Sequence, residues 1–289
     1  MKKWSAVLLA MLLVFSMAAC GESAPKQDAF DIYEQATAKA AEITSMEANI
    51  TATVNMVMAS EPETPIDLTL TGAMQQVIRT KTDFDLAMDM TLGMMGQSIG
   101  MKMYYKDGYM YQDMMGMKMK TAAPVDEVMD QMNVLDMENI KFSREDVKDM
   151  SMANVEGGTE INITFNGERM NTLITDLLSN MGMEDMLGTV SMTMSDIQFK
   201  MVVDADMNAK VQHIIFDATV EVEGEVVTMS ADVLVETSAV NTLEAVTLPA
   251  DLDSYIDMDE SMAALEEYAS EETTEEVLVE DVAEEGEAA

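Results

Sequence analysis

Strict alternation of apolar and polar residues is the dominant pattern of this chain, and residues 83–90 show it most clearly. The even positions of this segment are apolar, while the odd positions are three aspartates and one alanine. A period of two predicts a strand in a sheet that is buried on one face only. The apolar set of this strand is Phe84, Leu86, Met88 and Met90.

The same alternation recurs along most of the chain and predicts an antiparallel meander. The expected strands cover residues 45–58, 66–79, 97–105, 109–111, 117–120, 150–155, 161–165, 192–203, 211–222, 227–235 and 242–248. Residues 106–108 read Lys-Asp-Gly, a strong hairpin signal, and a second turn is expected near Gly116. The apolar parity changes between residues 194 and 197, so we expect a β-bulge near Ser195 and Asp196.

Three segments instead have helical spacing. Asp28 is the expected N-cap of a helix that runs to about Thr44. A second helix should open at Pro124 and extend to about residue 135, and a third should run over residues 167–181. Each has one apolar stripe that needs cover, so the pattern predicts an α+β fold.

The first twenty residues have the pattern of a secretory signal. Two lysines precede a nearly continuous apolar segment at residues 4–15, and small residues lead up to Cys20. The segment is too short for an ordinary membrane span. It resembles the lipobox of bacterial lipoproteins, with Met17 at the position where Leu is usual. That resemblance implies lipidation of Cys20 and cleavage before it. The alternatives are an ordinary secreted protein and an uncleaved N-terminal anchor.

Charge limits the partners of the mature chain. The full chain has a formal net charge of -38, and removal of residues 1–19, which carry two lysines and no acidic residue, makes it -40. This charge excludes nucleic acid as a partner and disfavours flat contact with anionic lipid. Cys20 is the only cysteine, so no intrachain disulfide can form.

Composition divides the chain into four parts. We expect a signal peptide at 1–19, a lipidated tether at 20–27, a folded domain at 28–256 and a tail at 257–289. The tail has fourteen acidic residues and no basic residue, which predicts disorder beyond a short helix at 261–268. It is either an interaction or spacing segment or simply a solvated end.

Three short segments carry a resemblance to a known group of lipoproteins. Residues 105–111 read Tyr-Lys-Asp-Gly-Tyr-Met-Tyr, residues 116–120 read Gly-Met-Lys-Met-Lys, and residues 247–252 read Thr-Leu-Pro-Ala-Asp-Leu. Together with the lipobox and the meander, they resemble the LolA/LolB and LppX-like lipoproteins, most closely the uncharacterised Gram-positive lipoproteins of that fold. The resemblance implies a strongly curved, half-open barrel with helices packed against an apolar concave face.

The same resemblance implies that the face holds acyl chains or another apolar ligand without chemistry. Independently, 34 methionines against seven phenylalanines suit a cavity that adapts its shape. The alternative for the same side chains is an ordinary core. The candidate ligand-lining residues are Phe84, Leu86, Met88, Met90, Met101 and Met103.

Two patterns imitate metal sites. The first is a cluster of methionines near residue 115, whose soft thioether sulfurs could select Cu(I). However, these methionines alternate with lysines as in a strand, and methionine is abundant throughout the chain. Asp204, Asp206 and Asn208 imitate the start of an EF-hand loop, yet Ala209 and Ile215 replace the expected Gly and Glu, so a hairpin turn is expected. The methionine cluster comprises Met114, Met115, Met117 and Met119.

Enzyme chemistry finds little support. His213 is the only histidine and falls by parity on the surface face of its strand. Nucleophile-elbow and phosphate-loop motifs are absent from the sequence. We therefore expect a non-enzymatic lipoprotein without cofactor or metal, anchored on the extracytoplasmic face of the cell membrane, with a lipid or apolar ligand and an envelope protein as partners. The competing hypothesis is a surface interaction module with a closed core.

Overall fold

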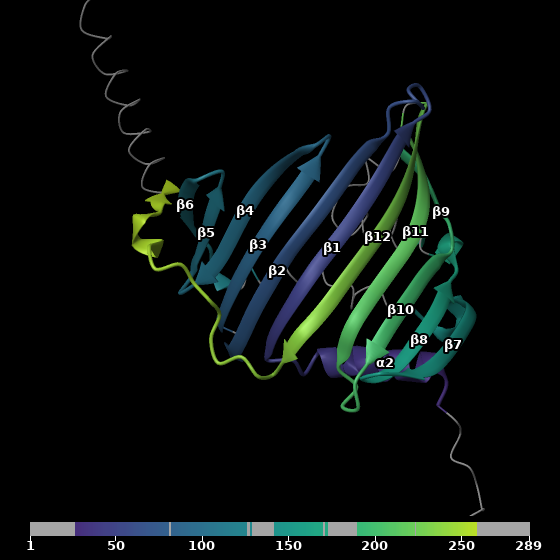
Figure 1. The fold of residues 1–289 in the computed structure, drawn as a ribbon, viewed down its shortest axis with the longest axis horizontal. Coiled ribbons are helices and arrows are strands. Elements are labelled where there is room, and N and C mark those ends of the chain that lie inside the picture. The colour runs from purple at the N-terminus through teal and green to yellow at the C-terminus, as the bar shows by residue number, and fades with distance from the viewer. Residues whose placement is uncertain are drawn as a thin grey trace, which may run out of the picture.

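The fold is one large, curved and unclosed antiparallel sheet (Figure 1). The computed structural model describes residues 27–80, 82–125, 128, 142–169, 171–172, 190–222 and 224–258. In the described part, the strand order is β13-β6-β5-β4-β3-β2-β1-β12-β11-β10-β8-β7, and β9 pairs with β11. The meander expected from the alternation is therefore present.

The strands differ widely in length. The first half of the sheet contains β1 (Ser45–Met58), β2 (Ile66–Thr80), β3 (Asp83–Met94), β4 (Gln97–Lys106), β5 (Tyr109–Met114) and β6 (Met117–Ala122). The second half contains β7 (Val147–Val155), β8 (Gly158–Phe165), β9 (Val190–Met194), β10 (Ile197–Val203), β11 (Ala209–Val222) and β12 (Glu225–Val240). The short β13 (Ile256–Asp257) runs parallel to β6.

Two-residue turns join the strands from β3 to β6. The turns are Met95-Gly96, Asp107-Gly108 and Met115-Gly116, and both residues of each have positive φ. This is the type I′ hairpin geometry, whose twist matches that of the flanking strands. The turns at residues 106–108 and near Gly116 were both expected.

The predicted bulge is confirmed by the register of β11. Met194 pairs with Ala218 and Gln198 pairs with Ile215, so three residues of the β9–β10 segment face two residues of β11. The extra residue lies between β9 and β10, where the backbone N–H of Ser195 donates to the carbonyl of Asp217 at 2.8 Å. This accounts for the change of parity.

The helix expected after Asp28 is α2 (Ala29–Ala40), which ends four residues earlier than Thr44. Asp28 Oδ1 accepts hydrogen bonds from the backbone N–H groups of Phe30 and Asp31, both at 3.0 Å, and so caps the helix. α2 packs against β7 and β8, and its side chains Phe30, Ile32 and Ala36 are buried there. The second and third expected helices lie mostly outside the described residues.

The sheet has a second buried face, which the alternation did not predict. On β3, Phe84 and Leu86 are buried on one face, while Asp85 and Ala87 are buried on the other. Ala87 packs in a cluster with Val246, from the segment that follows β12. A strand was expected at residues 242–248, and this prediction is wrong. The segment is irregular and covers this face of the sheet. The same chain then reaches the outer edge of β6 (Figure 1).

Candidate functional site

The strand register brings methionines together in two straight rows on one face of the sheet. In the first row, Met90, Met101, Met114 and Met117 pair directly across β3, β4, β5 and β6. In the second row, two residues away, Met74, Met88 and Met103 pair across β2, β3 and β4, and Met119 follows on β6 beyond Gln112. Paired Cβ atoms in such rows lie about 4.5–5.5 Å apart. We call these eight side chains the methionine rows.

The methionine rows belong to the same face as the helix-covered core. Met88 pairs with Met74 on β2, and Met74 pairs with Ala48 on β1. Ala52 lies on the same face of β1 as Ala48. From Ala52 the pairing continues through Val233 and Ile214 to Phe199. Phe199 is buried in the cluster that α2 covers. One apolar face therefore runs across the sheet, closed under α2 at one side and lined by methionine at the other.

The six predicted lining residues all lie on this face but divide into two groups. Phe84 and Leu86 are buried in a cluster with Tyr105 and Val128, and the Phe84 and Tyr105 rings stack at 4.3 Å. Tyr105 Oη also donates to the carbonyl of Ala123 at 3.1 Å. Phe84 and Leu86 therefore belong to the packed core of the protein.

The other four predicted residues are only half-buried. Met88 packs against the edge of the Phe84 cluster, while Met90, Met101 and Met103 continue the rows away from it. Sequence reasoning did not assign the other four members of the rows to the ligand lining: Met74, Met114, Met117 and Met119. Their parity on each strand is correct, but only the register shows that Met74 stands beside Met88 and that Met114 stands beside Met101.

A row of alternating charges lies on the opposite face and fixes this register. Asp89, Lys102, Asp113 and Lys118 pair across the same four strands. Lys102 Nζ is 3.1 Å from Asp89 Oδ2, and this hydrogen bond raises the pKa of Lys102. A slip of one residue would exchange the charged and methionine faces, so the charges favour the observed pairing.

The segment after β12 is held to the opposite face by lysines from β6. Lys118 pairs with Asp251 and lies 5.6 Å from the ring centroid of Tyr255, and Lys120 Nζ is 3.3 Å from Asp257. The Lys118 ammonium lowers the pKa of Asp251. The lysines in the Gly-Met-Lys-Met-Lys segment thus hold this cover, while the methionines between them join the methionine rows.

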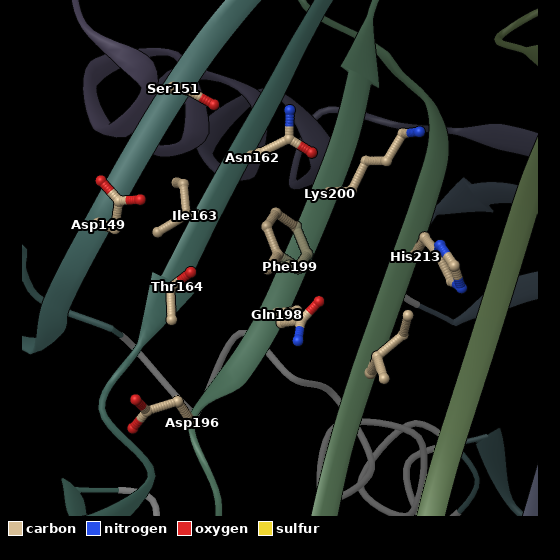
Figure 2. Close-up of a pocket in the computed structure, with 11 residues that line it drawn as sticks. Asp149, Ser151, Asn162, Ile163, Thr164, Asp196, Gln198, Phe199, Lys200 and His213 are labelled. Carbon is tan, nitrogen blue, oxygen red and sulfur yellow. The ribbon is translucent and has the colours of Figure 1, made fainter.

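The opposite face also carries an open polar groove of about 410 Å³ (Figure 2). Its charged groups already have partners: Lys200 Nζ is 3.1 Å from Glu160, and His213 Nε2 is 2.8 Å from Asp232. His213 thus lies on the surface face, as expected. We do not place the site in this groove, whose lining is Asp149, Ser151, Asn162, Ile163, Thr164, Asp196, Gln198, Phe199, Lys200, His213 and Ile215.

The metal-like patterns behave as structural elements. Met114 and Met117 face each other, but Met115 occupies the exposed turn between them. Asp204 Oδ1 accepts from the backbone N–H groups of Asp206 and Asn208 at 2.9 and 3.0 Å, which forms the expected turn. In the described part of the chain, no group of three or more His, Cys, Asp or Glu residues is arranged to hold a metal ion.

Several predictions remain outside the described residues. These include Cys20, the signal at 1–19, most of the tether and nearly all of the acidic tail. Among the helices that the structure does describe, none is long and apolar enough to cross a membrane.

Comparison with solved structures includes three distant likenesses. LprF from Mycobacterium bovis is 11% identical with a TM-score of 0.37, and the match covers 79% of this chain and 98% of LprF. The ywiB protein from Bacillus subtilis is 6% identical with a TM-score of 0.20, covering 70% of this chain and 99% of that protein. A putative AttH from Nitrosomonas europaea is 8% identical with a TM-score of 0.17, and the match covers 66% of this chain and 50% of that protein. Such TM-scores give these likenesses no weight for function.

Comparison of the sequence with characterised proteins and with protein families gives a clearer result. No curated protein matches the chain. One family model matches residues 28–254, which is nearly the whole of the expected folded domain. The chain therefore belongs to DUF6612, a family of unknown function.

Proposed function

We propose that this protein is a membrane-anchored, non-enzymatic lipoprotein that binds a lipid or another apolar ligand along its methionine rows. The observation that carries the proposal is that seven of the eight methionines in the rows are half-buried and Met117 is exposed, although the rows continue the apolar face of the core. Methionine is unbranched and polarizable, so such a surface conforms to chains of different shape. Phe84 and Leu86 form the packed floor beside it rather than the ligand surface.

The anchor is the second part of the proposal. Cys20 follows an apolar segment and small residues, as a lipidation site requires. Two acyl chains hold a protein at a bilayer far more firmly than one chain does. In cells fed a fatty-acid probe, the wild-type protein should be labelled and Cys20→Ala should not; equal labelling of both would remove the anchor from the proposal.

Ligand binding is tested by native mass spectrometry of the purified full chain, followed by organic extraction. We expect a co-purifying apolar molecule that is lost in Met88→Asp and in Met103→Asp. Thr91→Asp is the matched control, because it adds the same charge to the opposite, exposed face of β3. Circular dichroism should show all three variants folded. A wild-type chain that stays ligand-free when offered phospholipid would contradict the proposal.

One observation favours a second candidate, an interaction module with a closed core. The stacked Phe84–Tyr105 pair and Val128 already fill part of the face with protein side chains. In that case the methionine rows would be ordinary core, and function would survive Met88→Asp in a folded variant but not deletion of the tail at 257–289.

A further inference from the structure

Exposed apolar side chains gather at the tips of two neighbouring hairpins, β3–β4 and β5–β6. Met95 is 78% exposed and Met115 is 76% exposed, and both occupy the turns themselves. Six of the eleven large apolar side chains that are exposed in the described part of the chain lie at these tips. We call this set the methionine tips: Leu92, Met94, Met95, Ile99, Met115 and Met117.

Backbone preference does not account for methionine at these turns. Met95 and Met115 have φ values of 51° and 55° at the first turn position, a left-handed conformation in which a bulky residue is unusual. The turn at the other end of β4 and β5 provides an internal comparison. There Asp107, with the same φ of 51°, is a residue that type I′ turns favour. Since Met95 and Met115 are not buried either, a role outside the fold is the remaining physical reason for them.

The turn residues and apolar side chains of the methionine tips carry no charge themselves, although Asp113 Oδ1 accepts a hydrogen bond from the backbone N–H of Gly116 at 3.1 Å. Residues 90–101 and 114–117 contain no charged residue in a protein with 70 acidic and basic residues in total. A Cβ atom added to Gly96 or to Gly116 would meet no atom within 4 Å. The tips are therefore convex apolar points rather than the walls of a groove.

We propose that the methionine tips dock into a lipid surface with neutral headgroups. Convex apolar points need a partner that conforms to them, and a fluid bilayer does so. A second copy of the chain is disfavoured because both copies carry a formal charge of -38, and that charge likewise opposes anionic headgroups. Docking would bring the Met90–Met101 row, which lies two residues below Leu92 and Ile99, next to the lipid.

This docking surface shares only Met117 with the methionine rows, which form the ligand surface proposed above. It consists of strand ends and turns, whereas the proposed ligand lies along the face of the sheet. If mass spectrometry shows no bound ligand, the docking proposal is unaffected. If the vesicle experiment shows no docking, the ligand-binding proposal is unaffected.

The test is a site-specific fluorescence measurement on the full chain. Cys20→Ser removes the only native cysteine, and Ser98→Cys then carries an environment-sensitive NBD label beside the tips without replacing a methionine. Phosphatidylcholine vesicles should shift its emission to the blue, and vesicles rich in phosphatidylserine should do so less. The matched control carries the label at Asp107→Cys, in the same kind of turn at the opposite ends of the strands, and should not respond.

A second variant removes the apolar side chains while keeping the turns. Met95→Asn combined with Met115→Asn places a residue favoured in type I′ turns at both positions, so the fold should persist. Partition into phosphatidylcholine should fall by about tenfold or more. Three results would overturn the proposal: an equal shift at the Asp107 label, an undiminished shift in the asparagine variant, or a shift that rises with protein concentration in the absence of vesicles, which would indicate self-association.

Discussion

The two sides of the apolar face differ in the side chains that fill them. Under α2 the core is aromatic: Tyr33 lies 5.5 Å from the Phe199 ring, and Phe142 stacks on Phe165 at 3.9 Å. Between β2 and β6 the same face is lined by the methionine rows, which are half-buried except for the exposed Met117. Aromatic rings have few rotamers and specify one packing, whereas methionine adapts. One side is thus suited to hold the fold and the other to change its contacts.

The largest difference between the two sides should appear when a side chain is removed from each. Phe165→Ala deletes a fully buried ring that touches Tyr33, Phe142 and Phe199, and should lower the free energy of unfolding by about 3–5 kcal/mol. Met88→Ala on the half-buried side should cost only about 1 kcal/mol. Chemical denaturation measures both, and equal losses would show that the methionine rows are packed as tightly as the aromatic core.

Two glycines test how closely the strands are covered. A Cβ at Gly158, on the aromatic side, would overlap the carbonyl of Val203, so Gly158→Ala should destabilise the protein by about 3 kcal/mol. Gly100, on β4, pairs with Thr91 on the face opposite the methionine rows; Gly100→Ala would meet no atom within 4 Å there and should change stability by no more than about 0.5 kcal/mol. Thermal unfolding compares the two variants, and a large loss at Gly100 would contradict an open surface there.

The turn residues of the methionine tips should lower the stability of the methionine side of the sheet. Met95→Asn relieves an unfavourable turn residue and should stabilise the fold by about 0.5–1 kcal/mol. Asp107→Met makes the reverse change at the other end of β4 and β5 and should destabilise by a similar amount. If Met95→Asn is instead destabilising, Met95 makes a native contact that outweighs any strain in the turn.

The smallest expected effect is a pH dependence on the aromatic side. The Arg144 guanidinium, followed by the backbone hydrogen bond from Asp31, lowers the pKa of Asp28 below its usual value of 3.8. Because the folded pKa is depressed, this contribution to stability is present above the unfolded value and is lost as the pH falls through the folded one. Asp28→Asn should therefore make the loss of stability below about pH 4 shallower.

The partner of Asp28 supplies the control for that measurement. Arg144 donates to Asp28 Oδ2 at 2.5 Å and to Asp31 Oδ1 at 2.6 Å. Arg144→Gln should flatten the same part of the pH profile, and the double variant should add little to either single change. Additive effects would mean that the two groups titrate independently of each other.

Much of the fold was accessible from local pattern. The alternation in residues 83–90 correctly placed Phe84, Leu86, Met88 and Met90 on one face, because side chains in a strand alternate regardless of what covers them. The bulge after Met194 was equally visible, because one extra residue reverses the parity. The same reasoning failed for residues 242–248. Alternation reports which side chains are covered, not whether the backbone is paired.

The candidate site was only partly predictable. Six residues were predicted to line one ligand surface. Phe84, however, is buried in a cluster with Tyr105 and Val128, which come from other elements. Met74, Met114, Met117 and Met119 were not assigned to the lining, because the sequence of one strand does not show which residues pair with it on the next strand. The exposed turn residue Met95 was not recognised either, since its conformation is known only once β3 and β4 are paired.

By itself, the sequence determined the period of each strand, the N-cap at Asp28, the turn at Asp107-Gly108, the charge of the chain and its family. These properties depend on neighbouring residues or on composition. Only the tertiary structure decided that the methionines form two rows, that residues 241–257 cover the second face, and that two methionine turns lie at the same end of neighbouring hairpins. Each of these depends on register between strands, which is set by contacts between residues far apart in the chain.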